Sequence, residues 1–116
     1  MYVDGFVVPV PKDKVQAYKE LATIASQVWR EHGALSYVEC VADDVSHGEV
    51  TSFPRSVLAE EGEVVVLAWI TYPSKEVRDA CNAKVMSDPR LQCDPENLPF
   101  DGKRMFWGGF TTLVQA

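Results

Sequence analysis

The sequence lacks the short motifs that mark several common classes of enzyme and binding protein. Its 116 residues contain no phosphate-binding Gly-x-x-x-x-Gly-Lys-Ser/Thr, no dinucleotide-binding Gly-x-Gly-x-x-Gly and no Gly-x-Ser-x-Gly. Histidine and cysteine are scarce, with two and three residues, and no Cys-x-x-Cys pair occurs. ATP, NAD and zinc sites are therefore unsupported, and we expect no cofactor and no metal. An odd number of scattered cysteines favours reduced thiols over a disulfide framework.

Positive charge is also scarce. Eleven Lys and Arg residues face seventeen Asp and Glu residues, which gives a net charge of -6. Because binding to phosphates needs clustered basic side chains, we expect neither nucleic acid nor a membrane surface as a partner. Asp4 stands where an export signal needs basic residues, and the longest apolar run, residues 64–70, is far shorter than the ~20 residues that cross a bilayer. We therefore expect a soluble, cytoplasmic protein.

The overall composition is that of an ordinary globular protein. Hydrophobic residues make up 47% of the chain and charged residues 24%. This balance excludes intrinsic disorder and repetitive fibrous structures. The length matches one domain, and we expect a single domain over residues 1–116.

Hydrophobic periodicity predicts four strands and two helices. Apolar residues recur every three or four positions over 12–32 and 75–87, which is typical of amphipathic helices. Strands are expected at 2–10, 34–45, 63–72 and 104–114, with a bulge or a close backbone approach at Gly108-Gly109. The two long loops are 46–62 and 90–103. This β-α-β-β-α-β order predicts an α+β, ferredoxin-like sandwich, with a four-stranded antiparallel sheet and both helices on one face.

Two helices would cover only one face of such a sheet, whereas two of the strands are apolar on both faces. Residues 64–70 are apolar at odd and at even positions, so both faces of that strand are apolar. In the last strand Trp107 alternates with Phe106, which also places a large apolar side chain on each face. Each large side chain left in water forfeits ~1.5 to 3 kcal/mol, and a small domain has little stability to lose. We expect a homodimer in which the helix-free sheet faces pack together. The alternative is that the loop 46–62 folds over that face.

Several separate motifs, in one order along nearly the whole chain, carry a family resemblance. They are Tyr2-Val3-Asp4-Gly5-Phe6-Val7-Val8-Pro9-Val10-Pro11, Glu31-His32-Gly33-Ala34-Leu35, Tyr37-Val38-Glu39-Cys40, Thr51-Ser52-Phe53-Pro54-Arg55 and Pro99-Phe100-Asp101-Gly102-Lys103-Arg104-Met105. With these motifs the sequence resembles the YbaA-like family of bacterial proteins, a domain of unknown function. The resemblance implies the dimeric α/β-barrel superfamily, beside antibiotic-biosynthesis monooxygenases, EthD-type and YCII-type proteins, but no established activity. The segment 92–94 departs from the family's usual pattern.

Two polar residues that lie among apolar neighbours are the candidates for catalysis. Glu39 shares a strand face with Tyr37 and Val41, so an inward-facing strand would bury its carboxylate and suit it to act as a general base. The alternative for Glu39 is an ion pair or an edge-strand position. His32, at the end of the first helix, is the candidate for proton transfer. Its alternative role is to cap the helix C-terminus.

Aromatic and cationic side chains are the candidates for ligand binding. Tyr18 and three tryptophans could line an apolar pocket between the helices and the sheet, or could simply form the core. Two arginines with apolar neighbours could clamp a carboxylate or hold a loop to the sheet. The candidate ligand-binding set is Tyr18, Phe53, Arg55, Trp69, Arg104 and Trp107.

Three functions fit these residues, and the sequence does not decide whether the protein is an enzyme. The first is a homodimer that binds a small molecule in an apolar cavity between helices and sheet. The second rests on analogy with the monooxygenases of the resembling superfamily, and is a cofactor-independent oxygenation of an aromatic substrate. The third is a structural or regulatory interaction module without a cavity.

Overall fold

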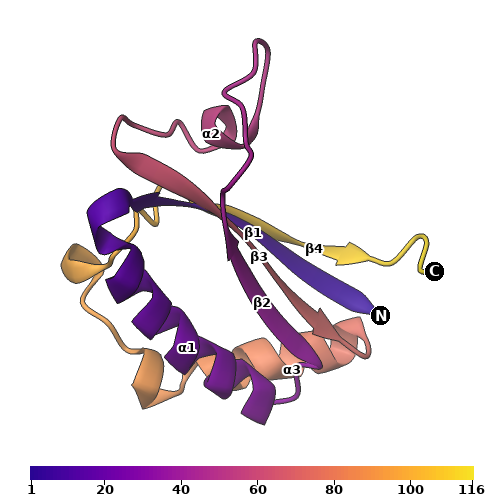
Figure 1. Ribbon diagram of the computed structural model, residues 1–116. Helices are drawn as coiled ribbons and strands as arrows, with labels where there is room; N and C mark the ends of the chain where they lie inside the picture. Colours follow the sequence, from indigo (N-terminus) through magenta and orange to yellow (C-terminus); the bar gives the residue numbers. More distant parts are fainter.

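A four-stranded antiparallel sheet in the order β2-β3-β1-β4 forms the centre of the computed structural model, which describes residues 1–116 (Figure 1). The strands are β1 (Tyr2–Pro11), β2 (Ser36–Val41), β3 (Glu63–Tyr72) and β4 (Phe106–Thr111). The predicted α+β class and the antiparallel sheet are confirmed. The strand 63–72 has the predicted bounds, whereas β2 and β4 are shorter than predicted.

Two long helices, α1 (Val15–Glu31) and α3 (Lys75–Met86), lie on one side of this sheet (Figure 1). They pack on β3, where Val28 of α1 and Val85 of α3 form a buried cluster with Ile70 and Tyr72. Within each helix the buried apolar residues recur at helical spacing, so burial of one helix face accounts for both helices. Neither helix is long and apolar enough to cross a membrane.

The helix ends follow local backbone chemistry. At the start of α3, the Ser74 hydroxyl oxygen accepts a hydrogen bond from the Val77 N–H at 3.2 Å. After α1, Gly33 has a φ of 121°, in the region that favours glycine, and the chain turns back into the sheet. α3 begins at the predicted residue and α1 ends one residue before its predicted end, whereas a separate 3₁₀ turn, Lys12–Lys14, precedes α1.

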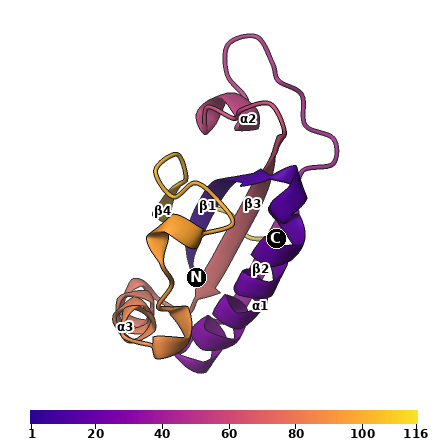
Figure 2. The same cartoon turned by 90° about the vertical axis from the view of Figure 1, so that its left-hand side faces the viewer.

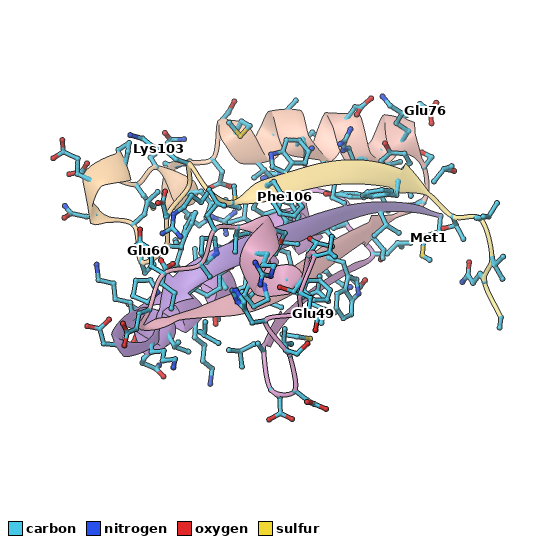
Figure 3. The ribbon with its side chains drawn as sticks, turned by 90° about the horizontal axis from the view of Figure 1, so that it is seen from above. Met1, Glu49, Glu60, Glu76, Lys103 and Phe106 are labelled. Atoms are coloured by element: carbon cyan, nitrogen blue, oxygen red, sulfur yellow. The ribbon has the colours of Figure 1, made fainter.

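The other side of the sheet carries a short helix, α2 (Phe53–Ser56), within the long connection from β2 to β3. Val57, which follows α2, is buried against Val7 and Val65, so this connection covers one end of the helix-free face. Phe110 stays 64% exposed on the same face. Figure 3 views the molecule from the α2 side, with Phe106 beside β4. Cover by the loop 46–62, the alternative to a homodimer, is therefore present, but only in part.

A buried ion pair joins α3 to the sheet near the chain's N-terminus. Asp4 is 1% exposed, and its carboxylate accepts hydrogen bonds from Arg78 Nη2 at 2.9 Å and from Tyr72 Oη at 3.1 Å. The Arg78 guanidinium also lies against the Tyr2 ring, at 5.3 Å from its centroid. A β-carbon at Gly109 would lie 2.8 Å from Arg78 Nη2. The predicted close approach at this glycine is therefore present.

Substituting Asp4 tests how strongly this ion pair stabilises the fold. Asp4→Ala removes the buried partner of the Arg78 charge and leaves it only the exposed Asp79, so we expect the free energy of unfolding to fall by about 3 kcal/mol. Tyr72→Phe removes only a neutral donor and should cost about 1 kcal/mol. Urea unfolding followed by tryptophan fluorescence measures both. Equal losses in the two variants would contradict a dominant role for the charge.

Candidate functional site

A cavity of about 390 Å³ lies between α1, the sheet and the connection from α3 to β4. Figure 2 shows that connection in front of β1 and β3, with α1 beside it. Fifteen of the seventeen lining residues are hydrophobic. The fifteen are Phe6, Val8, Tyr18, Leu21, Ala22, Ala25, Trp29, Tyr37, Ala68, Ile70, Leu91, Cys93, Leu98, Phe100 and Met105. The other two are Pro95 and Glu39, and Glu39 is the only charged group. The volume is in the usual range for small-molecule pockets.

Small side chains on facing elements explain why the space is left open. Ala22 and Ala25 of α1 face the cavity from one side, and Ala68 of β3 faces it from the sheet. Larger residues at these positions would fill the gap as they do beside Val28, where the core is closed. The hydrophobic pattern of α1 therefore both attaches the helix and leaves room beneath it.

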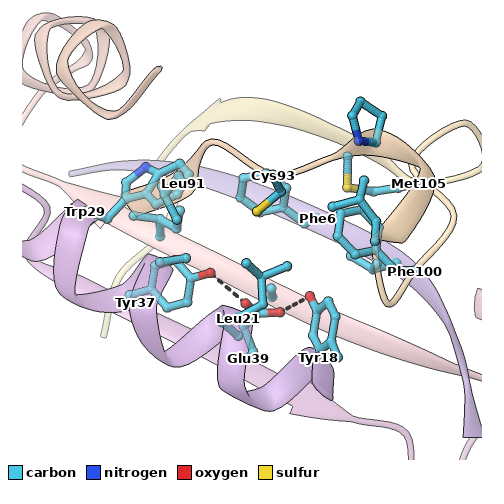
Figure 4. A pocket seen from close by; sticks show the side chains of 17 residues that line it. Phe6, Tyr18, Leu21, Trp29, Tyr37, Glu39, Leu91, Cys93, Phe100 and Met105 are labelled. Carbon is cyan, nitrogen blue, oxygen red and sulfur yellow. Dashed lines mark hydrogen bonds between the residues drawn. The ribbon is translucent and has the colours of Figure 1, made fainter. Parts of the chain in front are cut away.

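Glu39 of β2 accepts a hydrogen bond from a tyrosine on each side (Figure 4). The Tyr37 hydroxyl donates to Glu39 Oε2 at 2.6 Å, and the Tyr18 hydroxyl of α1 donates to Oε1. Burial, helped by the nearby Glu39 charge, raises the pKa of both tyrosines well above their usual range. Both phenols are therefore protonated donors at neutral pH. We call these three residues the Tyr-Glu-Tyr group.

The connection from α3 to β4 forms the outer wall of the cavity and is anchored at both ends. At one end Arg90 Nη2 lies 2.6 Å from Glu31 Oε2 of α1. At the other, Arg104 Nη2 lies 2.7 Å from Glu63 Oε2 of β3. Between these anchors, residues 93–98 form hydrogen bonds only among themselves. Apolar contacts alone thus hold the middle of this wall against the cavity.

Of the two predicted catalytic candidates, only Glu39 lies in the cavity. His32 lies past the end of α1, half-buried, with Nε2 3.3 Å from Asp88 Oδ2. Hydrogen bonds, first from Arg90 and also from His32, lower the pKa of the Asp88 carboxyl well below its usual range. The structure therefore does not bring His32 and Glu39 together, and it gives His32 a contact that ties α1 to the cavity wall.

Among the candidate ligand-binding residues, Tyr18 lines the cavity and the two arginines do not. Arg104 bridges Glu63 and Asp101, while Arg55 donates to the His47 and Gly48 carbonyl oxygens, both at 2.9 Å. Both guanidinium groups hold loops, which was the alternative considered for them. Phe53 belongs to α2, on the far side of the sheet from the cavity.

The predicted tryptophans lie in different environments. Trp29 lines the cavity. Trp69 alternates with Ala68 and Ile70 on β3, so it faces the helix-free side. Trp107 faces the helix side but lies on the edge strand, 52% exposed, where its ring stacks on Phe6 at 5.9 Å between centroids. Trp69 and Trp107 therefore do not line the cavity, although Trp107 supports a residue that does.

Sequence reasoning missed Tyr37 as a site residue and missed the whole outer wall. Tyr37 stands two positions before Glu39 in a strand, so the alternation already placed both side chains on one face. The wall residues carried no such signal, because Leu91, Cys93 and Phe100 come from 3₁₀ turns and irregular chain. The structure contains no cluster of three or more His, Cys, Asp and Glu side chains that could hold a metal ion.

The raised pKa values of Tyr18 and Tyr37 predict a loss of stability at alkaline pH. Above their ordinary pKa of about 10, the unfolded chain releases protons that the folded chain keeps. The contribution of the two phenols to the free energy of unfolding is therefore complete below pH ~10. Above that pH it falls by roughly 1.4 kcal/mol per pH unit for each tyrosine. The double variant Tyr18→Phe/Tyr37→Phe should flatten this slope in urea titrations. An unchanged slope would show that the two phenols ionise normally.

Comparison with known proteins matches almost the whole chain. The family described as "Protein of unknown function (DUF1428)" matches residues 1–102. Curated relatives named "Uncharacterized protein YbaA", from Escherichia coli strain K12 and from Shigella flexneri, are 58% identical over 113 residues, which is 97% of this chain and 97% of each relative. These matches confirm the YbaA-like resemblance. The chain therefore belongs to the DUF1428 family of proteins of unknown function.

Proposed function

We propose that this protein binds a small molecule, and that the ligand occupies the cavity beneath α1. The observation that supports this is a cavity of about 390 Å³ in which an apolar lining surrounds one hydrogen-bonded carboxylate. Binding sites typically combine apolar walls with a few oriented polar groups. A module without a cavity, the third function considered, does not explain this space.

The lining indicates the chemistry of the ligand. Apolar walls favour an apolar body, and Glu39 is the only charged residue among them. An anionic ligand would meet that charge in a poorly solvated space, where repulsion is strong. An ionised carboxylate has about four lone-pair sites, and the two tyrosines use two of them. The proposed ligand is therefore neutral, largely apolar, and carries an O–H or N–H donor.

Cofactor-independent oxygenation of an aromatic substrate is the second candidate function. Glu39 favours it, because a carboxylate in an apolar cavity is placed to remove a proton from a bound phenol. The Tyr18 and Tyr37 hydroxyls flank the same position and could donate to the anion formed. His32, outside the cavity, has no part in this proposal.

We further propose a ferredoxin-like domain of the dimeric α/β-barrel superfamily that forms a homodimer through its helix-free face. The strand order β2-β3-β1-β4 and the position of both long helices on one side support the fold. Apolar side chains that α2 leaves uncovered support the dimer. This open-face patch consists of Val3, Val38, Leu67, Trp69, Phe106 and Phe110.

A neutral fluorescent probe tests binding in the cavity. N-phenyl-1-naphthylamine has two aromatic ring systems and one N–H donor, and its emission rises in apolar surroundings. We expect a dissociation constant on the order of 10 µM. Ala25→Phe fills the cavity and should weaken binding at least tenfold, about 1.4 kcal/mol. The matched control Ala17→Phe, on the exposed side of α1, should leave binding unchanged.

The same probe series tests the role of the Glu39 charge. The anionic analogue 8-anilinonaphthalene-1-sulfonate should displace the neutral probe about tenfold less effectively, because its sulfonate meets the carboxylate. Glu39→Gln removes the charge and should narrow this difference. Binding of the sulfonate is measured as displacement of the neutral probe, not as the sulfonate's own emission, so that sulfonate bound at the open-face patch is not counted. Equal effects of Ala25→Phe and Ala17→Phe would instead reject the cavity as the binding site.

Sedimentation equilibrium tests the dimer. We expect the mass of two 12.9 kDa chains at tens of micromolar protein. Leu67→Glu and Phe110→Glu would each bury a carboxylate in the interface, and should raise the dimer dissociation constant by at least about a hundredfold. Val114→Glu, at an apolar and exposed position beyond β4, is the control. A single-chain mass for the unsubstituted protein would overturn the proposed dimer.

A further inference from the structure

A second cavity, of about 330 Å³, lies in the groove between α1 and the edge strand β2. We call it the outer groove. Unlike the first cavity it offers several polar groups from α1, namely those of Lys19, Thr23 and Ser26. It shares four lining residues with the first cavity, and these are Tyr18, Ala22, Tyr37 and Glu39.

The shared residues place the Tyr-Glu-Tyr group between the two spaces. On α1, Leu21 and Ala25 face only the first cavity, and Lys19 and Thr23 face only the outer groove. Tyr18 and Ala22 lie between these two sides of the helix. The partition at this point consists of hydrogen bonds to Glu39 and one small alanine, not of interlocked apolar side chains. Because the two tyrosines use only two of about four lone-pair sites of the Glu39 carboxylate, it can also accept a hydrogen bond from a ligand hydroxyl at this point.

We propose that the outer groove binds the polar head of an amphipathic ligand whose apolar body occupies the first cavity. The inference rests on the proposed function and adds the ligand class, namely a neutral, hydroxyl-rich head on an apolar body. Such a ligand passes Glu39, which accepts a hydrogen bond from its first hydroxyl group. The polar and apolar halves of the ligand then match the polar and apolar linings of the two spaces.

The charges and hydrogen-bonding groups of the outer groove favour a neutral head with hydroxyl groups. The groove carries one charge of each sign, so Glu39 would repel an anionic head and Lys19 a cationic one, and neither charge suits both residues. Thr23 Oγ1 and Ser26 Oγ each donate to a helix carbonyl at 2.7 Å, so their own lone pairs are free to accept from a ligand hydroxyl. The Lys19 ammonium supplies donors for ligand oxygens. The outer groove therefore offers both acceptors and donors to the hydroxyl groups of a ligand.

Competition between two octyl compounds tests the proposal. Octyl β-glucoside, kept below its critical micelle concentration, and 1-octanol share the same alkyl chain and differ in the head. Each displaces bound N-phenyl-1-naphthylamine, and we expect the glucoside to bind about tenfold more tightly. The triple variant Lys19→Ala/Thr23→Val/Ser26→Ala should remove this advantage and leave octanol unchanged. The control variant Gln16→Ala/Glu20→Ala/Gln27→Ala, at exposed positions of α1, should preserve it.

The outcomes separate this inference from the proposed function. Displacement by octanol but not by the glucoside would show that a head group cannot pass Glu39, and would overturn the inference. A glucoside advantage that survives the triple variant would place the head elsewhere and overturn it as well. If the unsubstituted protein does not bind the neutral probe at all, the proposed function itself fails.

Discussion

The hydrogen bonds from Tyr18 and Tyr37 to Glu39 are the interactions on which the arrangement of α1, β2 and the cavity depends. A carboxylate in a mostly apolar space is costly unless its oxygens are paired. Here donors from the helix and from the strand itself pair them, and no buried side-chain nitrogen or oxygen in the structure lacks a partner. The pairing fixes α1 over β2, so Ala22 and Ala25 can face an open space without the helix collapsing onto the sheet.

Two acids on the same face of the sheet show how differently a fold can use a carboxylate. Asp4 is paired with the Arg78 guanidinium and is almost completely buried, so its charge is neutralised inside the structure. Glu39 is paired only with neutral phenols, so its charge is stabilised but not cancelled. The first arrangement holds α3 to β1. The second leaves an electrostatic preference in the cavity, which is the property that a binding site needs.

Periodicity predicted most of the fold, but it was ambiguous where both faces of a strand are apolar. The continuous apolar run predicted β3 with its observed bounds, and the alternation on β2 placed Glu39 beside Tyr37. On β3, however, Trp69 and Ile70 are equally apolar, so no pattern shows which of them lies under the helices. The wall residues Leu91 and Phe100 follow no period, because their positions depend on the distant anchors at Arg90 and Arg104.

The cavity itself is difficult to explain as ordinary core packing. Domains of this size have only about 5 to 15 kcal/mol of stability, and unfilled apolar space lowers it because the lining atoms lose contacts. Larger side chains at Ala22, Ala25 or Ala68 would recover those contacts. The chain instead combines small residues around the space with a wall that ion pairs hold only at its ends. A bound apolar molecule would supply the missing contacts, so the same residues that weaken the empty protein favour the occupied one.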